Sequence, residues 1–440
     1  MRRLPSLVLL ALVVSLSVGS ISSNEIGKTP VSVTCDYPGR VGPEVPVSTG
    51  GQSTNSRIVW TGAEYGVAFD VQQNPVNPGE IRFRRLGPEG SPIAAETTVS
   101  TQTGAPCRPT LMWSGDGYGV AWLGPCNENA GMYFSRLDAT GAKIGPDVPL
   151  ATPAFAYVTS GVWNGQEYGI AWSDIRSSVS GIYFARVSRN GTLLGPATRV
   201  TGSIWVARVP SLVWTGSEYA VTWDGQLSRN GAWGIYLSRF TQTGLKIGPD
   251  LPVSTTGSEG DASLVWTGTG FGVTWFDNRD GDHPEIYFAR LDATGNRIGS
   301  DVRVTNDPGD SFLPSIVWTG SEFGVSWDDR RETRDVYFAR LDAEGGKLGE
   351  DLRVSHEPDE SLLSRLVWTG SEYGISWTGY SDFFGSVSFA RVGCAVTNQP
   401  PVADAGEDIA AECASPLGTG IRLENYRSPT GLVNLGGQAF

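Results

Sequence analysis

Residues 366–380 read "LVWTGSEYGISWTGY", and close copies of this stretch recur along the chain. Apolar and polar residues alternate on both sides of "TGSE", and aromatic and β-branched residues are frequent, which is typical of two strands joined by a tight turn. The first tryptophan of each copy recurs every 50 to 53 residues, at Trp60, Trp113, Trp163, Trp214, Trp266, Trp318 and Trp368. A fixed period of this length predicts a fold built from seven similar units.

Each unit reads as four short strands. In the sixth copy we expect strands at residues 315–320, 322–329, 335–342 and 350–355. Turns such as "TGSE" and "DAEG" contain the glycine that tight hairpin turns favour. Seven four-stranded units predict an all-β fold, a seven-bladed β-propeller, with an open array of the same units as the alternative.

The two ends of the repeat region favour a closed ring. Residues 39–49, "GRVGPEVPVST", match residues 296–305, "NRIGSDVRVT", which form the fourth strand of a unit. The seventh copy ends at residues 387–396, "VSFARVGCAV", without a fourth strand of its own. We therefore expect the N-terminal strand to complete the last blade, which would leave no open edge there.

The cysteines fit the same arrangement. The alignment of the repeats places Cys35 and Cys394 at the same turn of the shared blade, so we predict a disulfide between them. Cys107 and Cys126 flank the first hairpin of the second copy at nearly opposite positions, which predicts a second bridge. Cys413 is left without an assigned partner. Two disulfides favour an oxidising compartment.

The N-terminus indicates export. Two arginines precede an apolar run at residues 4–18, which is shorter than the roughly 20 residues that span a membrane. We therefore divide the chain into a signal peptide at 1–23, the propeller at 24–397, and a linker with an incomplete module at 398–440. The expected location is secreted or at the cell surface. No second apolar stretch is long enough for membrane insertion.

The negative net charge of the chain limits the classes of partner that it could bind. The formal net charge is -13, whereas nucleic acid and anionic membrane surfaces require a basic surface. We expect no nucleic-acid partner. A carbohydrate or protein ligand is compatible with this balance, and the sequence leaves the oligomeric state open.

The unit at residues 317–355, "VWTGSEFGVSWDDRRETRDVYFARLDAEGGKLGEDLRVS", resembles the blades of secreted bacterial propellers related to the sialidase and BNR-repeat class. The resemblance covers residues 36–396. Members often carry an Asp-box, S-x-D-x-G-x-x-W, and the nearest stretch here, "SGDGYGVAW" at 114–122, has its glycine and tryptophan out of register. The arginine triad, nucleophilic tyrosine and acid-base carboxylate of sialidases find no residue-by-residue match. No catalytic residue is assigned.

The tail departs from the repeat. Residues 398–424, "NQPPVADAGEDIAAECASPLGTGIRLE", resemble the opening of the PKD-type, immunoglobulin-like modules of bacterial secreted proteins. This resemblance implies the start of a β-sandwich, of which only a part is present in the chain.

Features found in most copies indicate structure. One arginine recurs in every unit, and we expect each to pack and bond locally within its own blade; the set is Arg85, Arg136, Arg186, Arg239, Arg290, Arg340 and Arg391. A D-x-R turn follows the second strand in three copies and indicates a local ion pair, at Asp174/Arg176, Asp277/Arg279 and Asp329/Arg331.

Departures from the repeat indicate function. The loops between the second and third strands, and between units, vary and are expected on one face of the ring. Of 15 tryptophans, seven lie in first strands and six in second strands, which leaves Trp205 and Trp233 in variable loops of the fourth unit. Tyr157, Phe312, Tyr380 and Phe383 are assigned to the same class of loop. Such aromatics could stack on sugar rings or fill the loops themselves.

Evidence for metal sites is sparse. "DNRDGD" at 277–282 resembles an oxygen-rich calcium loop, with Asp277, Asp280 and Asp282 as candidate ligands, although acidic turns are common in acidic chains. His283 and His356 lie in variable loops without a second histidine at ligand spacing, so zinc is not expected. No other cofactor is expected.

These observations favour a secreted non-catalytic binding or adhesion propeller that recognises carbohydrate or a protein through its variable rim. A glycan-active hydrolase or lyase with its site at the central mouth is the alternative, and a structural spacer of a larger surface protein is the second. Paired carboxylates over the channel would favour hydrolysis. Aromatics without such a pair would favour binding.

Overall fold

The computed structural model describes residues 38–394, except 51, 73–78, 102–103, 127–130, 152–155, 177–178, 203–204, 282, 332, 357–359 and 382–383. The chain divides into two units, Met1–Ala395 and Val396–Phe440, and the described residues all belong to the first. The expected signal peptide and PKD-like segment lie outside them. A search of the described part for a helix that could cross a membrane finds none.

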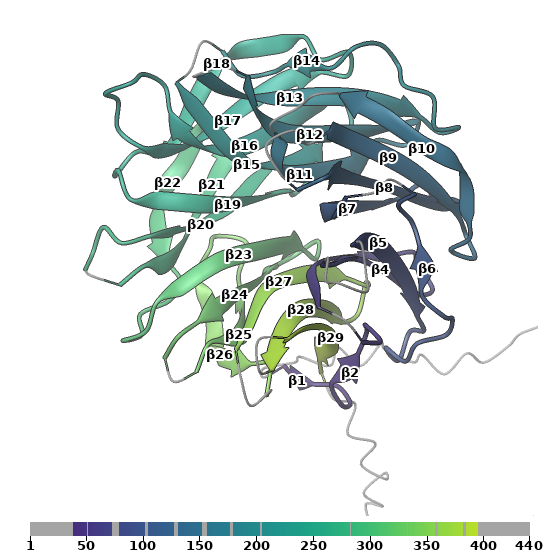
Figure 1. Cartoon of the computed structure of the whole chain (residues 1–440). Coiled ribbons are helices and arrows are strands. Elements are labelled where there is room, and N and C mark those ends of the chain that lie inside the picture. The colour runs from purple at the N-terminus through teal and green to yellow at the C-terminus, as the bar shows by residue number, and fades with distance from the viewer. Residues whose placement is uncertain are drawn as a thin grey trace, which may run out of the picture. The chain divides into compact units, whose positions relative to one another are not determined.

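Seven antiparallel sheets are arranged in a ring, each built mainly from four strands consecutive in sequence (Figure 1). The described residues contain strands and no helix. The all-β, seven-bladed propeller predicted from the sequence is therefore confirmed.

The strands are as follows, with each blade running from the channel outward. Blades 1 to 3 contain β3 (Ser53–Trp60), β4 (Tyr65–Val71), β5 (Glu80–Leu86), β6 (Thr97–Thr98); β7 (Cys107–Trp113), β8 (Gly117–Gly124), β9 (Gly131–Asp138), β10 (Lys143–Ala151); β11 (Ala156–Trp163), β12 (Glu167–Arg176), β13 (Val179–Ser188), β14 (Thr198–Arg199). Blades 4 and 5 contain β15 (Val206–Trp214), β16 (Glu218–Gln226), β17 (Gly234–Thr241), β18 (Lys246–Ser254); β19 (Glu259–Trp266), β20 (Gly270–Asp277), β21 (Glu285–Asp292), β22 (Arg297–Arg303). Blades 6 and 7 contain β23 (Ser311–Trp318), β24 (Phe323–Asp329), β25 (Asp335–Leu341), β26 (Lys347–Arg353); β27 (Ser361–Trp368), β28 (Tyr373–Ser381), β29 (Phe384–Gly393), with β1 (Gly39–Arg40) and β2 (Val45–Pro46) at its outer edge.

The N-terminal strand completes blade 7, as the sequence predicts. Gly39 pairs with Gly393, and Val45 pairs with Phe389, both antiparallel. Figure 1 shows β1 and β2 beside β29, at the point where the two ends of the propeller meet. An edge that would otherwise expose unpaired backbone groups is thereby covered.

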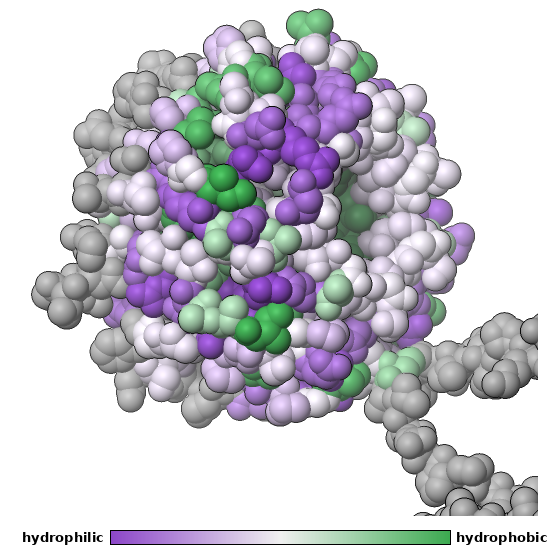
Figure 2. All heavy atoms as spheres, turned by 90° about the vertical axis from the view of Figure 1, so that its right-hand side faces the viewer, coloured by the Kyte–Doolittle hydropathy of each residue, from purple (hydrophilic) through white to green (hydrophobic). Residues whose placement is uncertain are grey.

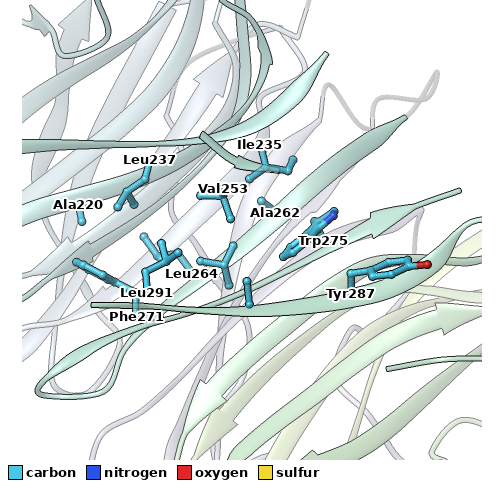
Figure 3. Close-up of a cluster of buried hydrophobic side chains, with 12 residues drawn as sticks. Ala220, Ile235, Leu237, Val253, Ala262, Leu264, Phe271, Trp275, Tyr287 and Leu291 are labelled. Carbon is cyan, nitrogen blue, oxygen red and sulfur yellow. The ribbon is translucent and has the colours of Figure 1, made fainter. Parts of the chain in front are cut away.

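Neighbouring blades share apolar cores. In Figure 3, Leu237 and Val253 of blade 4 lie with Leu264, Phe271 and Trp275 of blade 5 in one cluster. The second-strand tryptophans are all fully buried, whereas the first-strand tryptophans are half-buried. Burial of such large rings on both sides of each seam accounts for much of the cohesion of the ring.

The recurrent arginines bond within their own blade and also reach the next one. Arg85 pairs with Glu64 at 2.6 Å in blade 1, and its Nη1 donates to the carbonyl of Thr140 in blade 2. Glu64 also accepts a hydrogen bond from Tyr118 of blade 2. The local role expected from sequence is therefore confirmed in part, because Arg85, Arg136, Arg239 and Arg290 also donate to a carbonyl of the next blade.

The innermost strands are longer than the sequence predicts. Each contains a register shift, and six of them carry a residue with positive φ at this point, as Asp261 does at 51°. Pairing resumes beyond the shift, so that β23 begins at Ser311. Phe312 and Tyr157 consequently lie in β23 and β11. Tyr380 lies in β28, the second strand of blade 7, so the assignment of all three residues to loops is corrected. The alternation of apolar and polar residues is interrupted at the bulge, because the extra residue there turns the following side chains to the other face of the sheet. The sequence pattern therefore ends at the bulge although the strand continues.

The disulfides are described in part. Cys107 and Cys126 form a bridge with their Cα atoms 5.9 Å apart, as predicted. Cys394 is disulfide-bonded, and its predicted partner Cys35 lies outside the described residues, as does Cys413.

Candidate functional site

Trp205 and Trp233 both lie on blade 4, at the ends of strands that face the variable loops. Trp205 precedes β15, and its backbone N–H donates to the carbonyl of Gln226 at 3.0 Å. Trp233 directly precedes β17. Both side chains are half-buried, so each ring is held by the blade and still presents part of its surface.

An arginine lies over each of these tryptophans. The guanidinium carbon of Arg208 is 4.3 Å from the Trp233 ring centre, and that of Arg229 is 5.4 Å from the Trp205 ring centre. Arg208 also pairs with Asp224 at 2.7 Å, and Asp224 is fully buried at the end of β16. A cation held over an aromatic face restrains both side chains. We call Trp205, Arg208, Leu227, Arg229 and Trp233 the blade-4 cluster.

Leu227 is included in the blade-4 cluster because it is an exposed apolar residue in the loop between β16 and β17, which also contains Arg229 and Trp233. Six large hydrophobic side chains of the described part are strongly exposed, and five of them lie between the third strand and the start of the fourth, each in a different blade. Leu227, at 42% exposure, is the one that lies in a loop between second and third strands. Scattered single apolar residues are ordinary on a protein surface, and Figure 2 shows that pattern on the side it presents.

The other predicted rim residues do not join this cluster. Phe312 packs edge-on against Phe276 at 5.2 Å, and thus fills the seam between blades 5 and 6. Tyr380 is half-buried in β28 of blade 7, where burial and the charge of Asp70 raise its pKa. Tyr157 lies in β11, and its side chain lies outside what the structure describes, as does the whole of Phe383.

A cavity of about 230 Å³ lies at the centre of the ring, lined by all seven innermost strands. Three charged residues line this central cavity: Arg57 of blade 1, Arg365 of blade 7 and Asp261 of blade 5. Burial is the largest influence on all three, and it lowers the pKa of both arginines. Sequence reasoning missed these residues.

Asp261 and Asp224 form a pair of neighbouring carboxyl groups beside the central cavity. Burial, followed by the charge of Asp224, raises the pKa of Asp261 to about 6. Burial also raises the pKa of Asp224, one oxygen of which accepts from Arg208, while its Oδ1 is buried without a hydrogen-bond partner among the described residues. Asp261 lines the cavity, whereas Asp224 and Arg208 do not, although the charges of both act on Asp261.

Equivalent carboxylates elsewhere have a structural role. Asp70 of blade 1 accepts hydrogen bonds from Thr54, Asn55 and the backbone N–H of Arg108 in blade 2. Asp328 of blade 6 accepts likewise from the backbone of Leu363 in blade 7. Asp328 also pairs with Arg334 at 3.3 Å, as Asp224 does with Arg208, but the Arg208 side chain is 46% exposed whereas that of Arg334 is 15% exposed.

The loop proposed for calcium is already occupied by side-chain contacts. Asp277 accepts from Arg279, Thr256 and the Trp275 indole. Asp280 accepts from the Tyr287 hydroxyl, and Asp282 lies outside the described residues. Among the residues that the structure describes, no group of three or more His, Cys, Asp or Glu could hold a metal ion. The calcium site stays a prediction.

The D-x-R turns form the ion pairs expected of them in two blades. Arg279 binds Asp277, and Arg331 binds Asp329 at 2.9 Å. The guanidinium groups also lie over Tyr287 and Tyr337, at 4.5 and 4.0 Å from the ring centres. These contacts account for both turns as structural devices, and the side chain of Arg176 in the third is not described.

Comparison with known proteins supports the fold. A scan against protein-family models and a search of curated proteins both give no match. A protein of unknown function from Dyadobacter fermentans is 12% identical, with a TM-score of 0.52, over 81% of this chain and 99% of that one. Its likeness supports the propeller architecture.

Two glycoside hydrolases of family 43 are also similar. A thermostable enzyme is 10% identical with a TM-score of 0.36, over 54% of this chain and 88% of that one. An endo-arabinanase from Bacillus licheniformis is 14% identical with a TM-score of 0.34, over 53% and 92%. The expected relation to the sialidase and BNR-repeat class and to PKD modules stays a prediction.

Proposed function

We propose that the protein is an extracellular, non-catalytic module that binds carbohydrate through the blade-4 cluster. The observation that supports this most is the placement of Trp205 and Trp233 on one blade, each half-buried and each with an arginine over its ring. Pre-positioned aromatic surface stacks on sugar rings at a small entropic cost, and the arginines add hydrogen-bond donors for hydroxyl groups.

The setting of the cluster supports the same function. Asp224 is fully buried and holds Arg208, so the position of the Arg208–Trp233 stack is fixed by the core of the blade rather than by a loop alone. The Cys107–Cys126 disulfide supports an oxidising, extracellular location. Export itself rests on the N-terminal sequence.

The test incubates the full chain with insoluble and soluble polysaccharides and measures both retention and newly released sugar ends. Retention without release, lost in a Trp205→Ala/Trp233→Ala variant, is the expected result. Absence of retention on every polysaccharide would contradict carbohydrate binding and direct attention to a protein partner.

A glycan hydrolase is the second candidate, and the Asp224–Asp261 pair favours it. The pKa of Asp261 is raised to about 6, and Asp224 is a second carboxyl group close to it. Glycoside hydrolases use two carboxyl groups, one as a proton donor with a raised pKa and the other ionised. Released sugar ends that disappear in an Asp261→Asn variant, while retention persists, would favour hydrolysis over binding alone.

A further inference from the structure

In four blades, the residue at one position of the repeat links the innermost strand to that of the next blade by a hydrogen bond. This position lies three residues before the first-strand tryptophan and carries a small hydroxyl residue in five blades, namely Thr110, Ser160, Ser211, Ser263 and Ser315. In the last four, the hydroxyl oxygen accepts a hydrogen bond from a backbone N–H of the following blade, at 2.9 to 3.3 Å. Serine at this position therefore stabilises the ring.

Blades 1 and 7 depart from this rule at the same position. They carry Arg57 and Arg365, and because the two blades are neighbours, both guanidinium groups enter the central cavity from one side. The Nη1 of Arg57 donates to the carbonyl of Ser56 at 2.9 Å, and that of Arg365 to the carbonyl of Ser364 at 2.6 Å. Within the described part of the chain, neither arginine forms an ion pair.

Two such charges are unfavourable without a counter-ion. Burial and the charge of Arg365 both lower the pKa of Arg57. The nearby Asp70 is already bonded to Thr54, Asn55 and a backbone amide. Guanidinium groups in a protein interior normally have a carboxylate or another oxyanion as partner. Asp328 and Asp261 act electrostatically on Arg365, and Asp70 acts on Arg57, but no carboxylate of the described residues forms an ion pair with either arginine. The cavity thus holds two guanidinium groups without a directly bonded oxyanion.

The remaining lining is also rich in donors. Ser160, Ser211, Ser263 and Ser315 use their oxygens as acceptors towards the next blade, which leaves each hydroxyl proton for a further acceptor. Asp261 is the one lining carboxyl group, so the three charged side chains sum to one positive charge when Asp261 is ionised. A cavity of about 230 Å³ is smaller than the roughly 300–1,000 Å³ of drug-sized pockets.

We propose that the central cavity binds a small monovalent hydroxy-carboxylate, of the size of a single sugar acid, with its carboxylate held between Arg57 and Arg365. Planar guanidinium groups match a carboxylate in two-point contacts. The serine hydroxyls and Asp261 then serve the hydroxyl groups of the ligand. This site is separate from the blade-4 cluster, so it stands whether or not the cluster binds carbohydrate.

The test is calorimetric titration of the full chain with D-galacturonate at pH 7.5 and low salt, with D-galactose and inorganic phosphate as comparison ligands. Galacturonate binding without galactose binding is the expected result. An Arg57→Ser/Arg365→Ser variant should weaken galacturonate binding at least tenfold. Serine is the residue that blades 3 to 6 carry at this position, so the change follows the repeat itself.

The control is Arg290→Gln, which removes one arginine charge outside the cavity, as the single Arg365→Ser variant does inside it; Arg290 donates to the carbonyl of Ala343. It should bind galacturonate as the unaltered chain does. Equal binding by the serine variant, or no binding of galacturonate by the unaltered chain, would overturn the proposal. Tighter binding of phosphate than of galacturonate would overturn the carboxylate assignment. If the double variant does not fold, the single Arg365→Ser variant provides the same comparison.

Discussion

The Tyr65 hydroxyl of blade 1 donates a hydrogen bond to the Glu372 carboxylate of blade 7 at 3.1 Å, across 307 residues of sequence. Glu372 also pairs with Arg391 of its own blade. The same arrangement joins Tyr118 to Glu64 and Tyr373 to Glu322. The seam that closes the ring therefore uses the contact that joins other neighbouring blades, in addition to the pairing of β1 and β2 with β29.

Closure of the ring can be tested at the glycine that Tyr65 covers. A Cβ at Gly374 would lie 2.5 Å from Cε1 of Tyr65, so Gly374→Ala forces the two blades apart. We expect a loss of about 1–3 kcal/mol in the free energy of unfolding, measured by chemical denaturation. Gly39→Ala is the control, because a Cβ there meets nothing within 4 Å. Equal stability of both variants would contradict a closely packed closing seam.

The Cys107–Cys126 bridge closes a loop of 19 residues. On a chain-entropy estimate, its removal in a Cys107→Ser/Cys126→Ser variant lowers the free energy of unfolding by about 3 kcal/mol. Denaturation of the unaltered chain with and without reductant should give a loss of similar size or larger. Peptide mapping without reduction also tests the predicted Cys35–Cys394 pair. Free thiols at both of those positions would exclude it.

Asp261 makes stability depend on pH. Its pKa is raised to about 6 in the fold, so the folded state binds a proton more tightly than the unfolded state does. This contribution favours folding at low pH and is lost as pH rises through the window from roughly 4 to 6. The charged groups that act on it are Asp224, Arg365, Arg208 and Arg108.

An Asp261→Asn variant removes that dependence. Relative to the unaltered chain, it should be more stable at pH 7.5 than at pH 4, as measured by denaturation at the two values. A difference between variant and unaltered chain that is the same at both pH values would show that the Asp261 carboxyl titrates normally.

Arg57 should reduce the stability of the empty protein. Arg57→Ser removes a charge that Arg365 opposes and places at the site the residue that four other blades carry there. Residues kept for function at a cost in stability typically yield about 0.5–2 kcal/mol when they are replaced in this way. We expect thermal unfolding at low salt to occur at a higher temperature in the variant. A lower temperature would assign Arg57 a structural role.

The sequence predicts the ring of blades well because the same strand pattern occurs seven times along the chain. Seven tryptophans at one period and a lone fourth strand at residues 39–49 lead to blades and to their closure without any knowledge of contacts. For the recurrent arginines, the sequence predicts the bonds within a blade but not the bonds to the next blade. The Thr140 carbonyl that accepts from Arg85 belongs to a turn of the next blade. The distance between two blades depends on how they pack, and the local sequence pattern does not predict it.

The candidate sites were harder to predict for a different reason. Trp205 and Trp233 were recognised because they depart from the repeat in variable loops. Arg57 and Arg365 depart from it inside a regular strand, where the aligned copies have arginine in place of the serine of four other blades. That these side chains enter the cavity depends on the bulge in each innermost strand, which periodicity does not reveal.

The most direct test of the central claim is a binding isotherm on the best-retained polysaccharide for three forms of the full chain. These are the unaltered chain, Trp205→Ala/Trp233→Ala, and Leu245→Ala, which removes a 67% exposed apolar side chain from the turn between β17 and β18 of the same blade. Binding weakened at least tenfold in the tryptophan variant and unchanged in the leucine variant is the predicted result. Equal binding by all three forms would contradict recognition by the blade-4 cluster.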